Sequence, residues 1–513
     1  MTGLIHPLAT VPRDELVARA EADPLRPRFH FVSPAGWLND PNGVCQWNGT
    51  YHLFYQYNPE GAFHHNIRWG HATSADLVTW TDQPVALEPS AGPDAGGCWS
   101  GVLVNDNGTP TLVYSGRADE RELACVAVGS ADLLNWTKAA GNPVIAAPPA
   151  GVDITAYRDH CVWREGDKWR QLVGSGIRGR GGTAFLYESA DLHAWDYIGP
   201  LYIGDASHGD PAGTDWTGTM WECVDLFRTG GGSLGSDPVD SSPDVLVFSA
   251  WHDGDTRHPL YWTGRYSGDS FVPAALHRLD YGGRFFYAPQ SFRDDMGRRI
   301  MFGWLQEGRS DEAMVDAGWS GVMSLPRMAT VADDGMLRFA PVPEIEALRR
   351  EHVSMPGFVL SDAGAPVSAG VSGRLLDLEL DVQIAPGAVL RLVVLGSEDG
   401  AEETVVELSR APGDGCEGSL RLDRSRSSLD ATVDTEDKSG PVPMPGGRVH
   451  LRVLLDRSAV EIFANGMPLT ARVYPTLGGG RVSLAASGGS VRLLALDAWT
   501  MAGIFDGPRP LLP

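Results

Sequence analysis

Short segments that carry Trp, Asp, Glu or Pro recur at nearly even spacing over the first two-thirds of the chain. The segments are WLNDPNG at 37–43, CWSG at 98–101, RDH at 158–160, WEC at 221–223 and FYAPQ at 286–290. The steps are 60, 59, 63 and 67 residues between the markers Asp40, Ser100, Asp159, Glu222 and Pro289. A fixed period of this size is typical of stacked or radially arranged supersecondary units. Polar residues at the same phase of successive units are therefore expected to converge on one point.

A second repeat has nearly the same period. The motif SADLVTW at 74–80 returns as SADLLNW at 130–136 and as SADLHAW at 189–195, at spacings of 56 and 59 residues. Short alternating runs between these motifs, bounded by Gly, Asp, Asn or Pro, predict β-strands, for example at 50–55, 111–114 and 245–248. About 60 residues with several strands per unit fits a four-stranded propeller blade. We therefore predict an all-β chain with a five-bladed β-propeller over 29–340, whose innermost strands carry the marker segments.

The rest of the chain predicts three further parts. Residues 1–28 are expected to form an N-terminal extension with one short helix that ends near a pair of prolines. A linker helix is expected over 341–352, where the period is lost. Residues 353–513 alternate apolar and polar side chains and contain an Asn-Gly hairpin signal, which predicts an antiparallel β-sandwich. The polar stretch 409–444 is expected to form long loops between the strands of this sandwich.

Composition restricts the partners of the chain. The 65 acidic and 41 basic residues give a net charge of −24, so neither nucleic acid nor an anionic membrane surface is an expected partner, and a neutral substrate is the simpler expectation. The six cysteines show no C-x-x-C spacing and predict neither a zinc site nor a disulfide framework. No apolar run is long enough to span a membrane, and the N-terminus lacks a signal-like segment. A cytoplasmic protein is expected, although a secreted protein whose signal was removed would leave the same pattern.

Three of the markers are carboxylates, and carboxylates that converge on one pocket are the groups that cleave glycosidic bonds. Asp40 lies in a turn-favouring sequence, but its position at the first phase of the repeat, next to Trp37, favours a catalytic role. Asp159 follows Arg158, a pair that also fits a structural ion pair at the start of a strand. Glu222 lies between a Trp and a Cys, an apolar setting that favours the protonated acid and would let it donate a proton.

Two other patterns do not predict sites. GSGIRG at 174–179 matches G-x-G-x-x-G, but a strand-like run follows it where a dinucleotide site needs a helix. His64, His65 and His71 lack a matching carboxylate pattern, so no metal site is predicted.

Together these motifs resemble glycoside hydrolase family 32, the invertases and fructan hydrolases. The resemblance covers nearly the whole chain, with matching segments at 30–43, 51–59, 69–72, 99–101, 158–159, 222–223, 286–290, 324–327, 455–458 and 460–463. The fold that this family implies, a five-bladed propeller followed by a β-sandwich, agrees with the blade count predicted from the spacing.

The resemblance also implies roles for individual residues. Asp40 would be the nucleophile and Glu222 the general acid/base of a retaining double displacement on a β-fructofuranoside, while Asp159 would hold the fructose 3- and 4-hydroxyls and stabilise the transition state. Five further residues would line the fructose pocket: Asn39, Gln56, Trp99, Ser100 and Arg158. Such a mechanism places the two catalytic carboxyl groups about 5–5.5 Å apart. It requires neither a metal nor an organic cofactor.

The chain departs from the family pattern beside this pocket. His160 follows Asp159 where the family commonly has Pro, and His64, His65 and Asn66 stand where many members have Trp-Gly-Asn. Sucrose, short fructo-oligosaccharides, inulin and levan therefore all remain candidate substrates. A fructosyltransferase that uses the same carboxylates is the main alternative, whereas a non-catalytic fructan-binding protein is disfavoured because both essential carboxylates are present. The second domain could form a homodimer or shape the rim of the pocket.

Overall fold

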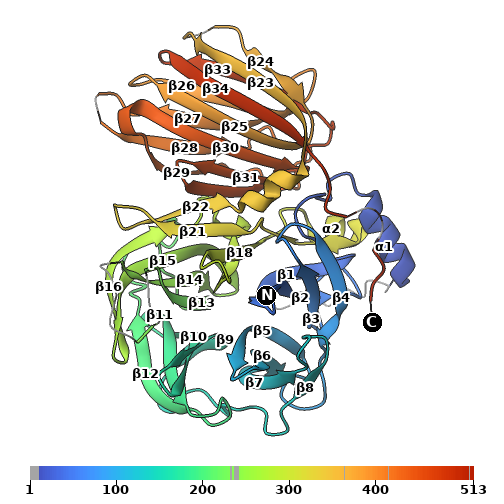
Figure 1. Cartoon of the computed structure of the whole chain (residues 1–513), viewed down its shortest axis with the longest axis vertical. Helices are drawn as coiled ribbons and strands as arrows, with labels where there is room; N and C mark the ends of the chain where they lie inside the picture. The colour runs from blue at the N-terminus through green and yellow to red at the C-terminus, as the bar shows by residue number, and fades with distance from the viewer. Residues whose placement is uncertain are drawn as a thin grey trace.

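The computed structural model describes residues 11–230, 234–235, 242–362, 364–413, 415–505, 507 and 509–512 of the chain. Figure 1 shows a ring of β-sheets, coloured blue to yellow, with a two-sheet sandwich in orange and red packed against one side. No helix within the described ranges is long and apolar enough to cross a membrane. The fold is thus mostly β, with a propeller followed by a sandwich.

Five sheets form the blades of the propeller. The first blade contains β1 (Gly36–Trp47), β2 (Thr50–Asn58), β3 (Arg68–Ser74) and β4 (Trp80–Leu87). The second contains β5 (Gly97–Asp106), β6 (Thr109–Ala118), β7 (Arg121–Gly129) and β8 (Trp136–Lys138). The third contains β9 (Ile154–Glu165), β10 (Lys168–Ile177), β11 (Gly181–Ser189) and β12 (Asp196–Ile203). The fourth blade contains β13 (Met220–Arg228), β14 (Asp244–His252), β15 (Asp255–Ser267) and β16 (Ser270–Arg278). The fifth contains β17 (Tyr287–Arg293), β18 (Arg299–Leu305), β20 (Val322–Met323), β21 (Arg327–Val331) and β22 (Leu337–Pro341).

The first strand of each blade lies innermost. In the ring, β1 contacts β5, β5 contacts β9, β9 contacts β13, β13 contacts β17, and β17 returns to β1. A short strand, β19 (Trp319–Ser320), pairs in parallel with β1 and joins the end of the propeller to its first blade. The markers Asp40, Ser100, Asp159, Glu222 and Pro289 all lie on these innermost strands. The predicted five blades, with the marker segments on the inner strands, are confirmed.

The SADL repeat forms the turn between the third and fourth strands of the first three blades. In the first copy the Asp76 carboxylate accepts hydrogen bonds from the backbone N–H groups of Val78 and Thr79, at 2.9 and 2.7 Å. The Leu of each copy, at 77, 133 and 192, is buried with a left-handed φ of 65°, 60° and 67°. A non-glycine residue is held in this conformation only where its surroundings require it. The SADL repeat in the sequence therefore corresponds to a turn of the same conformation in each of these three blades.

The second domain consists of two antiparallel sheets of six strands each. One contains β23 (Arg349–Leu360), β25 (Leu375–Ile384), β30 (Arg448–Asp456), β31 (Ala459–Ala464), β32 (Met467–Arg472) and β34 (Val491–Met501). The other contains β24 (Val367–Ser372), β26 (Val389–Gly396), β27 (Thr404–Arg410), β28 (Glu417–Asp423), β29 (Lys438–Pro443) and β33 (Arg481–Ser487). Asn465 and Gly466, with φ of 47° and 78°, join β31 to β32 in the tight hairpin that the Asn-Gly pair predicts.

One expectation about this half of the chain is only partly right, and another is wrong. The stretch 409–444 contains the long loop 424–437, as expected, but it also contains β28 and β29, the last two strands of one sheet. Leu420 and Leu422 point into the core at alternate positions of β28, but the polar residues around them conceal this alternation in the sequence. The linker helix expected over 341–352 is only a 3₁₀ turn, η2 (Pro343–Leu348), because the chain from Arg349 onward already pairs with β34.

The helical elements of the propeller pack at its closure. The helix α1 (Arg13–Ala22) confirms the predicted N-terminal helix, while residues 1–10 of the expected extension lie outside the described residues. Leu16 and Ala20 of α1 pack with Trp319 in a small apolar cluster beside α2 (Asp311–Ala317). Two further 3₁₀ turns are η1 (Gly283–Phe285) and η3 (Pro445–Gly447).

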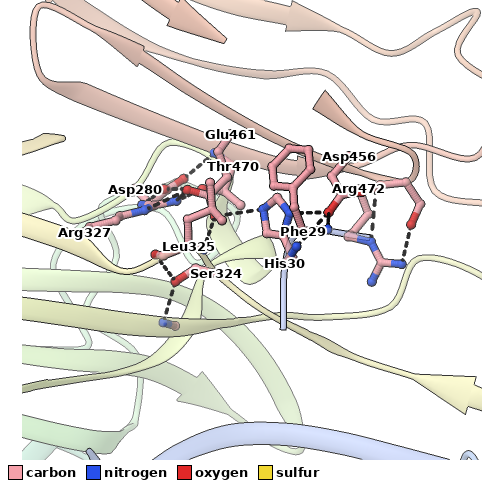
Figure 2. A network of polar contacts seen from close by, with 12 residues as sticks. Phe29, His30, Asp280, Ser324, Leu325, Arg327, Asp456, Glu461, Thr470 and Arg472 are labelled. Atoms are coloured by element: carbon pink, nitrogen blue, oxygen red, sulfur yellow. Dashed lines mark hydrogen bonds and ion pairs between the residues drawn. The ribbon is translucent and has the colours of Figure 1, made fainter. Parts of the chain in front are cut away.

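A buried polar network joins the two domains (Figure 2). Arg327 of the propeller contacts Asp280 at 2.7 Å and Glu461 of the sandwich at 2.8 Å. His30, at the start of the propeller, lies 2.9 Å from Asp456 through Nδ1 and 3.4 Å from Glu461 through Nε2. All five side chains are almost fully buried. Because isolated buried charges are costly, these paired groups fix the sandwich in one position against the propeller.

Candidate active site

Each inner strand carries an irregularity where its marker segment lies. The hydrogen-bond register shifts between Leu38 and Pro41 in β1, between Cys98 and Gly101 in β5, opposite Val173 and Gly174 in β9, between Glu222 and Asp225 in β13, and between Tyr287 and Gln290 in β17. Within these bulges Asp159, Cys223 and Ala288 have left-handed φ of 65°, 47° and 50°. Such bulges re-aim side chains and often border active sites. The common spacing of the markers thus reflects a bulge at the same place in every blade.

Asp40 of β1 is the most densely hydrogen-bonded carboxylate of the group. Its Oδ2 accepts hydrogen bonds from Ser100 Oγ at 2.5 Å and from Gln56 Nε2 at 3.0 Å, and its Oδ1 accepts one from Asn39 Nδ2 at 3.1 Å. Burial raises the pKa of Asp40 to about 6; the Ser100 hydrogen bond opposes this shift, and the nearby Glu222 charge adds to it. Asp40 is therefore a buried carboxylate that is ionised at neutral pH.

Asp159 and Asp40 share Cys223 as a neighbour. Its Oδ2 accepts a hydrogen bond from the Cys223 N–H at 2.9 Å, and Cys223 Sγ lies 3.5 Å from an oxygen of each aspartate. Burial raises the pKa of Asp159; the Arg158 charge opposes this shift, whereas the charges of Glu222 and Asp40 add to it. The carboxyl groups of Asp40 and Glu222, from two other blades, are thus close enough to Asp159 to raise its pKa.

The apolar setting expected for Glu222 is wrong, because a charged and a polar side chain from neighbouring blades hydrogen-bond both oxygens of its carboxyl group. Arg158 donates to Glu222 Oε1 from Nε at 3.0 Å and from Nη2 at 2.6 Å, and the Tyr287 hydroxyl donates to Oε2 at 2.5 Å. The Arg158 guanidinium also lies over the rings of Trp99 and Trp251, at 5.9 and 5.4 Å. The alternative that Arg158 pairs structurally with its neighbour Asp159 is therefore not what the structure has, because the guanidinium binds Glu222.

The structure brings together all eight residues that the sequence predicts for the site. Asn39, Gln56 and Ser100 contact Asp40, while Arg158 contacts Glu222 and lies against Trp99. Two contributors were missed as individual residues, Tyr287 and Cys223. Both belong to the recurring segments, so their position in the repeat was the available signal.

His160 lies behind the site. It is buried, its Nε2 is 3.1 Å from Ser115 Oγ, and the same Oγ accepts a hydrogen bond from the Asp159 N–H at 2.9 Å. Burial lowers the pKa of His160 to about 3, so the imidazole is neutral. Gln290, in the fifth segment, accepts from the Val44 N–H and donates to the Gly101 carbonyl, each at 3.0 Å, and so ties three blades together at the axis.

A cavity of about 490 Å³ lies between the inner strands and reaches Ser100, Asp159 and Cys223. Most of its lining comes from residues that follow the marker segments along these strands, and neither Asp40 nor Glu222 lines it. Among the described residues, no group of three or more His, Cys, Asp or Glu side chains is arranged to hold a metal ion. The inner strands supply two carboxyl groups with different partners. Asp40 accepts hydrogen bonds from uncharged donors, whereas Glu222 accepts them from an arginine and a tyrosine. Paired carboxyl groups of this kind are the equipment of glycoside hydrolysis.

Two family descriptions match the chain, one for each domain. The description "Glycosyl hydrolases family 32 N-terminal domain" matches residues 30–341, and "Glycosyl hydrolases family 32 C terminal" matches residues 344–500. The chain belongs to glycosyl hydrolase family 32.

Relatives of this family 32 protein include enzymes with different activities. Fructan 6-exohydrolase of Beta vulgaris is 32% identical, with 93% of this chain and 87% of the relative covered. Sucrose-6-phosphate hydrolase of Escherichia coli is also 32% identical, with 93% and 94% covered. The crystal structure of fructan 1-exohydrolase IIa from Cichorium intybus is 28% identical and superposes with a TM-score of 0.83, covering 94% of this chain and 98% of that one. This family 32 protein is thus a glycoside hydrolase of β-fructosides.

Proposed function

We propose that the chain is an exo-acting β-fructofuranosidase that works by a retaining double displacement. Asp40 attacks the anomeric carbon of a terminal β-fructofuranosyl unit while Glu222 gives its proton to the departing oxygen. Glu222 then takes a proton from a water molecule, which attacks the fructosyl ester on Asp40 and releases fructose. Both carboxyl groups return to their starting states, as a retaining mechanism requires.

The contrast between the surroundings of Asp40 and Glu222 carries this assignment. Asp40 accepts hydrogen bonds from three uncharged side chains, which stabilise its carboxylate as a nucleophile without neutralising it. Glu222 is held by Arg158 and by the Tyr287 hydroxyl on both of its oxygens, which fixes the carboxyl group in one orientation. Fixed orientation is what a group that must first donate and then accept a proton at one oxygen needs.

Asp159 is assigned to transition-state stabilisation. Its carboxylate is buried beside Asp40, and Cys223 N–H holds one oxygen in place. A fixed negative charge next to an oxocarbenium-like centre stabilises the positive charge that develops there. In this proposal Asn39, Gln56, Trp99, Ser100 and Arg158 line the fructose pocket.

The charges around the pocket favour an unphosphorylated substrate. The two guanidinium groups beside Trp99 already have carboxylate partners, because Arg158 binds Glu222 and Arg117 binds Glu122, each at 2.6 Å. The chain as a whole carries a net charge of −24. A phosphate group would have to compete with these carboxylates, so sucrose or a fructan is the proposed substrate.

A product time course tests the proposal. Wild-type protein and Asp40→Asn are each incubated with sucrose, sucrose 6-phosphate, 1-kestose, inulin and levan, and the products are separated by anion-exchange chromatography. Free fructose that forms only with the wild type, and faster from sucrose than from its 6-phosphate, is the expected result. Longer oligosaccharides as the main product would instead identify a fructosyltransferase, and a preference for sucrose 6-phosphate would contradict the substrate assignment.

A further inference from the structure

Three arginines recur at the blade period and lie at one end of the propeller. Arg164, Arg228 and Arg293 are 64 and 65 residues apart and lie on the inner strands β9, β13 and β17. Each follows the marker residue of its strand by four to six positions, which along an extended strand is on the order of 15 Å. The three arginines therefore gather around the axis at the end opposite to the catalytic carboxyl groups.

These arginines line the cavity of about 490 Å³ between the inner strands. A fourth, Arg299, lines it from the start of β18, where it is the partner of Arg293 in the ladder between β17 and β18. Arg164 and Arg293 are exposed, so this end of the cavity is accessible from solvent. A small molecule can reach the arginines without passing the catalytic site, because neither Asp40 nor Glu222 lines the cavity.

Three of the four guanidinium groups have no carboxylate partner. Arg228 binds Asp244 at 2.8 Å. The other three, Arg164, Arg293 and Arg299, form no ion pair with any residue that the structure describes. Acidic residues outnumber basic ones in this chain, 65 to 41, so partners are not scarce. Unpaired charges of one sign around a cavity concentrate ions of the opposite sign, which here means an anion.

The hydrogen bonds of the three unpaired arginines leave most of their N–H groups free. Arg164 and Arg293 donate from Nε to backbone carbonyl groups, at 3.4 and 3.2 Å, and both Nη atoms of each lack a partner in the described chain. Arg299 lies over the Phe227 ring at 4.6 Å and donates from Nη1 to Ser291 Oγ at 3.5 Å. Guanidinium groups with free N–H donors can form bidentate hydrogen bonds with an oxyanion.

One carboxylate lies among these arginines. Asp225 also lines the cavity, and its Oδ2 accepts hydrogen bonds from the Ser291 N–H and hydroxyl, at 3.1 and 2.5 Å. Burial lowers the pKa of Arg299; the Asp225 charge opposes this shift, and the Arg293 charge adds to it. A single negative charge therefore faces three positive charges, so a dianion would balance this end of the cavity.

We propose that the arginine-lined end of the cavity binds a small molecule that carries a phosphate group. A phosphate supplies the missing negative charge, and its oxygens accept the paired N–H donors of the free guanidinium groups. Val162, Leu226 and Phe292 provide apolar walls beside the arginines for the organic part of a phosphate ester. This site goes beyond the proposed β-fructofuranosidase function and does not depend on it.

Isothermal titration calorimetry on the full chain tests the site, with inorganic phosphate and glycerol 3-phosphate as the two probes. Arg299→Gln and Arg164→Gln each remove one guanidinium group. Because Arg164 is exposed, its replacement tests the site even if Arg299→Gln, at a half-buried position, fails to fold. Arg121→Gln is the matched control, because Arg121 is also an exposed arginine without an ion pair to a described residue, but it lies on β7 outside the cavity.

We expect the wild type to bind one phosphate group per chain. The Kd should rise about 10- to 100-fold in Arg299→Gln and in Arg164→Gln, the size of one hydrogen bond to a charged group, and should not change in Arg121→Gln. Tighter binding of glycerol 3-phosphate would identify a phosphate ester as the ligand, and tighter binding of inorganic phosphate would identify the free ion; both support the site.

Three results would overturn the proposal: no binding of either probe by the wild type, wild-type affinity in the folded Arg299→Gln or Arg164→Gln variants, or an equal loss in Arg121→Gln. The last result would show diffuse attraction to surface arginines in place of a site. The measurement does not use turnover, so a failure of the proposed hydrolase function would leave its outcome unchanged.

Discussion

Ser100 Oγ lies 2.5 Å from Asp40 Oδ2 and joins the inner strands of the first and second blades at the centre of the propeller. The two residues are 60 positions apart in sequence, one full period of the repeat. The contact has a chemical consequence as well as a structural one. A hydroxyl that donates to a buried carboxylate stabilises its ionised form against the effect of burial.

Ser100→Ala is expected to shift the pH dependence of hydrolysis. The Ser100 hydrogen bond lowers the pKa of Asp40, which burial raises to about 6, so its loss raises that pKa further. Because Asp40 must be ionised to attack, the acidic limb of the kcat/KM profile should move to higher pH by about one unit. The profile is measured on sucrose between pH 4 and 8. Ser175→Ala removes a buried hydroxyl that donates to the Ala156 carbonyl, and should leave the limb in place.

Asp40→Asn and Glu222→Gln should abolish turnover of sucrose while leaving the fold intact. Loss of proton transfer from Glu222 costs about 10²- to 10⁴-fold, whereas loss of the nucleophile removes the covalent step altogether. Glu222→Gln should lose least on 4-nitrophenyl β-D-fructofuranoside, whose leaving group needs no proton. Initial rates and circular dichroism spectra check both points. Activity near the wild-type level in either variant would contradict the mechanism.

Tyr287→Phe tests the orientation of the acid/base group. The Tyr287 hydroxyl donates to Glu222 Oε2 at 2.5 Å, and removing a hydrogen bond to an ionisable group costs roughly 1.5–3 kcal/mol, so kcat should fall about 10- to 100-fold. Tyr261→Phe is the matched control, because its hydroxyl is equally buried and accepts the Leu337 N–H away from the site. Equal kcat values for the two variants would show that the Tyr287 contact has no role in turnover.

Glu461→Gln should destabilise the interface between the propeller and the sandwich. It removes one carboxylate of a fully buried pair with Arg327, and breaking such a pair from one side costs about 3–5 kcal/mol. Asp153→Asn removes a carboxylate whose partner Arg178 is exposed, and should cost less than about 1 kcal/mol. Urea unfolding followed by tryptophan fluorescence measures both. A shift no larger than that of Asp153→Asn would mean that the network does not hold the domains together.

His30 should make the stability of the interface between the two domains decrease as pH rises. Burial opposes its charge, but the hydrogen bonds and charges of Asp456 and Glu461 outweigh burial and raise the pKa of His30 above 6.5. A group with a raised folded-state pKa contributes stability that is fully present below about pH 6.5 and is lost as pH rises through the folded pKa. The difference in unfolding free energy between wild type and His30→Gln should therefore shrink as pH rises above 6.5. A difference that grows over this range would contradict the assignment.

The sequence predicted the architecture because the propeller is a local pattern repeated. The period of the marker segments and of the SADL turns sets the length of one blade, and each SADL turn is built from contacts within its own blade. The repeat also made it possible to predict that Asp40, Asp159 and Glu222 belong to one site. Residues at the same position within successive blades lie at the same level around the central axis of the ring. By contrast, the strands β28 and β29 were missed because only one face of each carries apolar residues, between polar and turn-forming stretches.

Only the tertiary structure decided which residues bind which. In sequence Arg158 has Asp159 as its neighbour, but the left-handed backbone at Asp159 and the bulge around it bring the guanidinium to Glu222, 64 residues away. Tyr287, 65 residues beyond Glu222, completes that contact from the next blade. Likewise, Asp456 and Glu461 of the sandwich bind His30 and Arg327 of the propeller. Spacing along a chain fixes the phase of a strand within a blade, whereas the direction of a side chain at a bulge depends on the strands packed around it, and these come from distant parts of the sequence.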